Sequence, residues 1–197
     1  MAIRLKLSEL LSRLNRLKLI PRTGWLFCNV SPAGIEDVAQ HSFEVATITM
    51  LLADELRREG KKIDSGRAIG MAIIHDWAET EVADFPYTAL KHLESSGIKQ
   101  RMESSAMHEL LREIPESKKY LALWKEYGEK KTTESRLVHS ADYLSMLVQA
   151  IKYRERGVRS KELAELWLAV KNDLVPYAKE FKAEDRLINE LNSAFST

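Results

Sequence analysis

Two adjacent polar residues, His75 and Asp76, interrupt an apolar stretch that begins at Ala68. Burying a polar group without a partner costs roughly a few kcal/mol, and burying a charge costs more. A bound metal ion would offset this cost, because neutral imidazole and carboxylate groups both ligate divalent metals. The pair therefore suggests a metal site at the end of a buried helix.

Two further polar residues lie on or beside the apolar stripes of predicted helices. His41 lies on the apolar stripe of a predicted helix over 37–60, and Asp142 lies beside the stripe of a predicted helix over 133–155. Apolar stripes face the core, so side chains from three such helices can converge there. Two imidazoles and two carboxylates suit Mn²⁺, Co²⁺, Fe²⁺, Ni²⁺ or Zn²⁺ better than Ca²⁺. Such an ion makes hydroxide available near neutral pH.

Acidic residues follow the His-Asp pair at short spacing. Glu79 comes four residues after His75 and three after Asp76, which places it on the same face of one continuous helix. There it can take or give a proton beside the metal. Asp84 lies past the predicted helix end, before a Phe-Pro pair, in a loop that can cover the site.

The rest of the chain predicts an all-α protein. Apolar residues recur with a period near 3.6, and no alternating strand pattern of useful length occurs. Leucines from Leu7 to Leu17 form the stripe of a first helix, which Pro21 stops. The other predicted helices cover 37–60, about 64–79, 98–114, a short stretch around 120–127, 133–155, 160–173 and 184–195, with loops at 21–36, 80–88 and 174–176.

These elements predict a single-domain helical bundle over residues 1–197. Its motif-bearing core covers about 10–155, and the C-terminal helices cover 156–197. The 197 residues leave little room for a second full domain.

The composition bears on the partners and the location. Thirty basic residues balance 29 acidic ones, so the net charge of +1 gives no argument for binding bulk nucleic acid. No run of 18 apolar residues occurs, and charges interrupt the N-terminal segment, so we expect neither a membrane span nor a signal peptide. Cys28 is the only cysteine, which fits a reducing cytoplasm. We expect a cytoplasmic protein, with a homodimer as the favoured oligomer.

The four polar residues also form a known pattern. His41, the His75-Asp76 pair and Asp142 match the H…HD…D pattern, so the sequence resembles the HD-domain phosphohydrolases. The flanks narrow the resemblance to the 5′-deoxynucleotidase branch, over about residues 10–155. These flanks are Arg22-Thr23-Gly24-Trp25, Gln40 with Ser42 around the first histidine, Trp77-Ala78-Glu79, and Asp84-Phe85-Pro86.

The resemblance implies a helical bundle of the HD-domain type and a role for each motif residue. The metal ligands would be His41, His75, Asp76 and Asp142. Glu79 would serve the proton transfer, with Asp76 also counted as catalytic. Arg22 would orient the substrate phosphate, with Thr23 beside it. The sugar and base would be lined by Asp84, Phe85, Pro86 and Tyr87.

The implied reaction is hydrolysis of a deoxyribonucleoside 5′-monophosphate to nucleoside and phosphate. A Co²⁺ or Mn²⁺ ion is the favoured cofactor, with Mg²⁺, Ni²⁺, Fe²⁺ and Zn²⁺ as alternatives. Two other functions stay open at this point. One is another HD phosphohydrolase, acting on a nucleoside triphosphate, an alarmone or a cyclic nucleotide. The other is a non-catalytic helical module that senses nucleotides.

Overall fold

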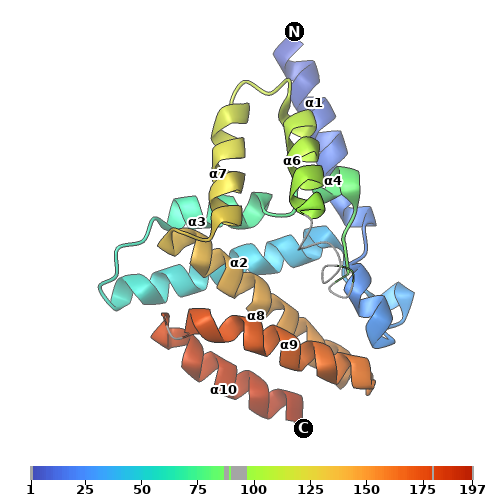
Figure 1. Cartoon of the computed structure of the whole chain (residues 1–197), viewed down its shortest axis with the longest axis vertical. Coiled ribbons are helices and arrows are strands. Elements are labelled where there is room, and N and C mark those ends of the chain that lie inside the picture. Colours follow the sequence, from blue (N-terminus) through green and yellow to red (C-terminus); the bar gives the residue numbers. More distant parts are fainter. Residues whose placement is uncertain (1, 87–88, 90–96, 179, 197) are drawn as a thin grey trace.

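The computed structural model describes residues 2–86, 89, 97–178 and 180–196 (Figure 1). Within these residues the regular secondary structure is helical, and one isolated bridge joins Pro21 to Asp37. The prediction of an all-α fold is confirmed. The helices are α1 (Ala2–Leu14), α2 (Val38–Arg58), α3 (Ser65–Ile74), α4 (Glu79–Val82), α6 (Ile98–Leu111), α7 (Ser117–Glu129), α8 (Thr133–Glu155), α9 (Lys161–Ala178) and α10 (Lys182–Ser196), with short 3₁₀ segments at Asn15–Leu19, Thr23–Cys28 and Pro32–Gly34.

The centre of the fold is formed by α2, α3 and α8, which pack against one another. Figure 1 shows α9 and α10 beside α8 at the end of the molecule that carries the C-terminus. It shows α1, α6 and α7 at the opposite end, near the N-terminus. Since His41 is on α2 and Asp142 on α8, the central packing positions both residues.

Side-chain caps set the starts of the central helices. The Asp37 carboxylate accepts from the backbone N–H of Gln40, and the Gln40 side chain accepts from the Asp37 N–H. This reciprocal pair satisfies two N–H groups that α2 would otherwise leave without partners. Thr132 and Ser135 form the same arrangement at α8. The polar residues before these helices therefore fix the register in which the apolar stripes meet.

The described core has two hydrophobic clusters. The larger one extends from Trp25 to Phe195 and includes Met71 and Ala72 of α3. The smaller one includes Ala78 and lies largely under α1 and α6. The His75-Asp76 pair falls on the stretch of chain that passes from the larger cluster to the smaller one.

Two expected helix boundaries were wrong. The helix predicted over about 64–79 ends at Ile74, and four turn residues separate it from α4. Trp124 donates its indole N–H to the His75 carbonyl at 3.2 Å, giving that group a partner outside a regular helix. The loop expected at 174–176 is instead part of α9, which includes Pro176 in its last turn. Complete burial of Leu174 favours the longer helix, and proline removes only one backbone donor there.

The first helix also differs from its prediction. Leu10 and Leu17 of the predicted stripe are buried, but Leu7 and Leu11 are 50% and 58% exposed. The regular helix ends at Leu14 and a 3₁₀ segment follows. This N-terminal helix therefore covers less of the core than its leucine pattern suggests.

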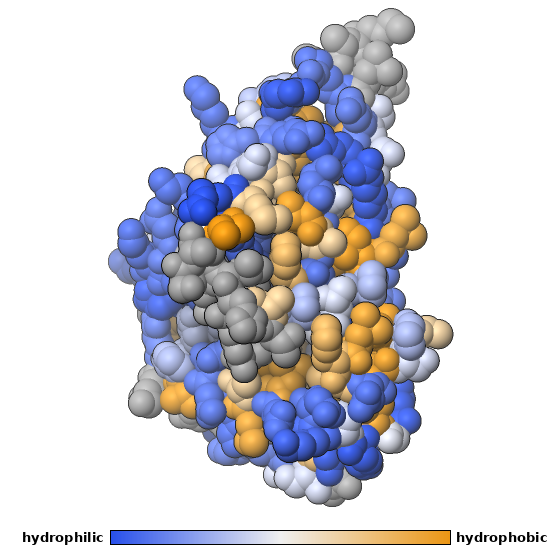
Figure 2. Space-filling model, turned by 45° about the vertical axis from the view of Figure 1, so that its right-hand side comes forward, coloured by the Kyte–Doolittle hydropathy of each residue, from blue (hydrophilic) through white to orange (hydrophobic). Residues whose placement is uncertain are grey.

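The surface carries several exposed apolar residues. On the face in Figure 2, hydrophobic residues lie in separate groups among hydrophilic ones. Phe43 and Met50, seven residues apart on α2, are 76% and 44% exposed. No helix of the described residues is long and apolar enough to cross a membrane.

A buried carboxyl group supports the segment that leads into α2. Trp25 donates its indole N–H to Glu36 Oε1 at 2.8 Å, and the Glu36 backbone N–H donates to the Tyr153 hydroxyl at 2.9 Å. The Trp25 and Tyr153 rings meet edge to face. Burial raises the pKa of Glu36 to about 7. The burial of Trp25 also agrees with a packing role for that ring.

We predict that replacing Glu36 with glutamine changes the pH dependence of stability. A carboxyl whose pKa rises on folding stabilises the folded state at low pH and loses that contribution as pH climbs from about 4.5 to about 7. When the pH is raised from 5 to 8, the free energy of unfolding of Glu36→Gln should therefore increase by roughly 1–3 kcal/mol relative to that of wild type. Urea unfolding at both pH values measures this. Identical pH dependence in the two proteins would contradict the prediction.

Candidate metal centre and active site

The structure brings three of the four predicted metal-binding side chains within mutual reach, and the fourth, Asp76, approaches two of these three. Ligand atoms of His41, His75 and Asp142 lie within 4.8 Å of one another. His41 Nε2 is 3.1 Å from Asp142 Oδ1, and His75 Nε2 is 3.1 Å from Asp76 Oδ2. Asp76 Oδ2 is also 3.8 Å from His41 Nε2. Ligands around one ion with bonds of about 2.1 Å are separated by similar distances.

The four facing atoms share a second property. His41 Nε2, His75 Nε2, Asp76 Oδ2 and Asp142 Oδ1 are all buried without a hydrogen-bond partner. Buried polar atoms are nearly always satisfied in folded proteins, so four orphans at one point need an explanation. A divalent cation fits, since two neutral imidazoles and two carboxylates are a suitable donor set.

The electrostatics favour charged aspartates in this group. Burial alone would raise the pKa of Asp142, but electrostatic interactions with His41, His75 and Arg22 hold it far below its usual value. Asp76 behaves in the same way, with His75 and Arg22 as the opposing groups. Burial chiefly lowers the pKa of His41, which favours the neutral ring that can ligate a metal.

Glu79 begins α4 instead of extending α3, so it is not on the same continuous helix as His75. Its side chain is buried, and its Oε2 atom has no hydrogen-bond partner. Burial, together with the nearby charges of Asp76 and Asp84, raises the pKa of Glu79 well above its usual value. The turn thus produces a buried carboxyl group whose surroundings favour the protonated form.

Arg22 and Thr23 are tied to the chain that follows α4. Arg22 Nη1 donates to Asp84 Oδ1 at 3.0 Å and lies 3.5 Å from Asp76 Oδ2. Thr23 donates to Asp84 Oδ2 through its backbone N–H at 2.6 Å and through its hydroxyl at 2.7 Å. Asp84 therefore orients the Arg22-Thr23 segment and links it to the group of acidic and imidazole side chains.

A strained residue precedes this contact. Ala83 has φ 61°, which an L-residue other than asparagine or aspartate rarely adopts. Such conformations cost about 1–3 kcal/mol and persist where the surroundings enforce them. Here the three hydrogen bonds from Thr23 to Asp84 supply that constraint.

The remaining predicted substrate-binding residues follow Asp84. Phe85 and Pro86 are both partly exposed. Tyr87, predicted to line the sugar and base, lies outside the described residues.

Sequence reasoning missed several residues that support the site. Lys99 on α6 pairs with Glu103 at 3.1 Å. Burial would lower the pKa of Lys99, but Glu103 and the charges of Asp76 and Glu79 raise it. These charge interactions indicate a second cation near the site, besides Arg22. The sequence does not indicate this role for Lys99, because only the tertiary packing of α6 brings Lys99 near the site.

Tyr127 on α7 is another residue that the motifs did not indicate. Its hydroxyl donates to Asp142 Oδ2 at 3.3 Å, and its ring contacts His75 edge to face. The ring also stacks on His139, whose Nε2 lies 2.9 Å from the Tyr127 carbonyl oxygen. Burial lowers the pKa of His139 to about 4. His139 therefore supports Tyr127 as a neutral packing residue.

Comparison with known proteins places the chain in a family. A family model described as HD domain matches residues 14–187. The chain therefore belongs to the HD domain family, and the resemblance seen in the motifs is confirmed.

Its relatives include proteins with named activities. The chain is 31% identical to the 5′-deoxynucleotidase HDDC2 of Xenopus laevis, over 82% of this chain and 76% of that protein. It is 30% identical to the 5′-deoxynucleotidase hdd1 of Schizosaccharomyces pombe, over 85% and 82%. A solved structure of a conserved hypothetical protein from Pyrococcus furiosus has 36% identity and a TM-score of 0.76, covering 96% of this chain and 99% of that one.

We predict that Co²⁺ stabilises the folded protein through the four facing atoms. A ligand at 100 times its Kd adds about 2.7 kcal/mol, which for a chain of this size is a rise in Tm of roughly 5–10 °C. Differential scanning calorimetry with and without Co²⁺ measures the rise.

His75→Ala should abolish most of the rise in Tm, whereas His108→Ala should retain it. His108 is an exposed histidine bonded only to its own helix, through the Ser104 carbonyl. An equal rise in His75→Ala and wild type would contradict the predicted binding site.

Proposed function

We propose that this protein is a metal-dependent 5′-deoxynucleotidase. It hydrolyses deoxyribonucleoside 5′-monophosphates to nucleosides and phosphate. The observation that carries the proposal is the convergence of four buried, unpartnered ligand atoms beside Arg22 and Glu79. The names of the relatives from Xenopus laevis and Schizosaccharomyces pombe support the substrate class.

His41, His75, Asp76 and Asp142 would hold the ion. When bound, it would supply Lewis-acid stabilisation of the phosphoryl oxygens and an activated water. Co²⁺ or Mn²⁺ is the proposed metal, because a mixed nitrogen and oxygen donor set suits either ion. Asp76 would then serve as a ligand and, at 3.5 Å from Arg22 Nη1, would link the metal to the phosphate-binding side chain, which is the catalytic role proposed for it.

Arg22 would bind the phosphate group of the substrate. Its side chain is 15% exposed, and Asp84 holds it in place from one side. A guanidinium presents paired N–H donors that match two phosphate oxygens. Lys99 would add a second positive charge near the phosphate, because its charge interacts with those of Asp76 and Glu79. Thr23 would help to position the Arg22 guanidinium through Asp84.

Glu79 would act as the general acid. Its raised pKa favours the protonated form, which can give its proton to the nucleoside O5′ as the P–O5′ bond breaks. The nucleoside leaves as an alcohol, and the attacking water's oxygen stays on phosphate. Asp84, Phe85, Pro86 and Tyr87 are proposed to lie along the sugar and base.

The proposal also covers the domain organisation, the oligomeric state and the location of the protein. We propose one HD domain over the whole chain, because the larger core cluster joins residues from Trp25 to Phe195. A cytoplasmic homodimer is also proposed. The exposed Phe43 and Met50 on one helix support self-association, since burying large apolar groups favours it.

The activity is tested with purified protein, Co²⁺ or Mn²⁺, and a panel of deoxy- and ribonucleoside monophosphates. Phosphate release from the deoxyribonucleotides is expected, and Asp76→Ala should lose both metal and turnover. Faster hydrolysis of nucleoside triphosphates than of monophosphates in the same panel would identify a different HD phosphohydrolase. A metal-loaded protein that releases no phosphate from any monophosphate would contradict the proposal.

We predict that Glu79→Gln lowers kcat by about 10²–10⁴, since the amide cannot donate the acid proton in the same way. Bound Co²⁺, measured by elemental analysis, should remain. Glu81→Gln is the matched control, because this carboxylate two residues away pairs with Arg13. A Glu79→Gln enzyme within threefold of wild type would remove Glu79 from the mechanism.

A further inference from the structure

The His41 ring is held from behind by two successive hydrogen bonds. Its Nδ1 lies 3.2 Å from Ser145 Oγ. Ser145 in turn donates its hydroxyl to Glu44 Oε2 at 2.8 Å. His41 and Ser145 are completely buried, so no bulk water competes for these contacts.

The direction of this chain fixes the tautomer of His41. A serine hydroxyl has one hydrogen, and Ser145 gives it to the Glu44 carboxylate. The Ser145 oxygen must then accept from His41, so Nδ1 carries the ring proton and Nε2 has a free lone pair. Nε2 is the atom that faces Asp142 and Asp76.

His75 has its Nδ1 proton fixed by a different kind of group. Its Nδ1 lies 2.7 Å from the Ala72 carbonyl oxygen, which can only accept a hydrogen bond. The backbone of α3 therefore fixes the His75 tautomer. The Nδ1 partner of His41 is instead the Ser145 hydroxyl, which can donate or accept. The direction of the hydrogen bond between His41 and Ser145 therefore depends on Glu44.

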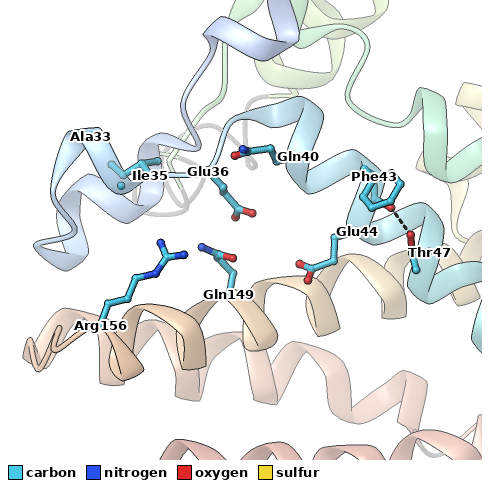
Figure 3. Close-up of a pocket in the computed structure, with 10 residues that line it drawn as sticks. Ala33, Ile35, Glu36, Gln40, Phe43, Glu44, Thr47, Gln149 and Arg156 are labelled. Atoms are coloured by element: carbon cyan, nitrogen blue, oxygen red, sulfur yellow. Dashed lines mark hydrogen bonds between the residues drawn. The ribbon is translucent and has the colours of Figure 1, made fainter.

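Glu44 reaches this chain from a pocket that contains none of the predicted site residues. The pocket has a volume of about 590 Å³ and is lined from α2, α8 and the segment before α2. Figure 3 shows Glu44 on the α2 side and Gln149 and Arg156 on the α8 side. Glu44 is only partly buried, whereas Ser145 is fully buried. The hydrogen-bond chain thus connects this pocket to the buried face of His41.

We propose that Ser145 and Glu44 are positioning residues that hold His41 in the tautomer with a free Nε2. The inference rests on the proposed function, in which His41 is a metal ligand. Partners of this kind orient ligating histidines, and their removal typically weakens metal binding by about 10–100-fold. Neither residue belongs to the H…HD…D pattern or its flanks.

The direct test is nitrogen NMR of the imidazole rings in the metal-free protein, with the His41 signals assigned by comparison with His41→Gln. Wild type should show the Nδ1–H form of His41. Ser145→Ala, which removes only one oxygen from a packed position, should reduce that form. Its Co²⁺ affinity by isothermal titration calorimetry should fall by at least about tenfold.

Glu44→Gln gives a second, independent variant on a partly exposed residue. The new amide N–H can donate to Ser145, which frees the serine hydrogen for His41 Nδ1. The Nε2–H form should then appear, with weaker Co²⁺ binding. Thr47→Ala is the control, because Thr47 lines the same pocket but bonds only to the Phe43 carbonyl, and it should match wild type in both measurements.

An unchanged His41 tautomer in folded Ser145→Ala and Glu44→Gln would overturn the proposal, as would wild-type Co²⁺ affinity in both. These measurements require no phosphate release. A failed nucleotidase assay with shifted tautomers would therefore count against the proposed reaction and still support the positioning role.

Discussion

The structure depends on one electrostatic constraint: four polar ligand atoms face one another in a buried space without hydrogen-bond partners. Two of them are carboxylate oxygens, and like charges at short range repel strongly where water is scarce. Arg22 offsets part of this repulsion from one side. A divalent cation would satisfy the remainder, because it replaces the missing partners of all four atoms at once. Many of the surrounding contacts serve to hold this arrangement in place.

The supporting contacts come from different parts of the chain. Tyr127 steadies Asp142 from α7, and Trp124 gives the His75 carbonyl a partner where α3 ends. Asp84 binds the Arg22-Thr23 segment across 61 residues of sequence. Each contact fixes an orientation that the site's own residues cannot fix. Catalytic geometry of this kind is sensitive to displacements of about 1 Å, which explains the density of these contacts.

Much of this arrangement could be predicted from the sequence. Helical periodicity indicated α2 and α8 and placed His41 and Asp142 on or beside their buried faces, and the Asp37 cap marked where α2 begins. The turn after Ile74 could not be predicted, because packing of the following residues on the second core cluster outweighs local helix propensity. Lys99 and Tyr127 reach the site only through tertiary packing, and no spacing rule indicates that. The same holds for the hydrogen bond from Ser145 to Glu44, whose partners are 101 residues apart.

The central claim is that the four facing atoms bind one metal ion. A crystal structure of the Co²⁺-loaded protein, with anomalous scattering recorded at the cobalt edge, tests it most directly. One strong anomalous peak is expected at the centre of the four atoms, about 2.0–2.2 Å from each. A fully loaded protein whose peak lies elsewhere, or is ligated by fewer than three of these residues, would contradict it.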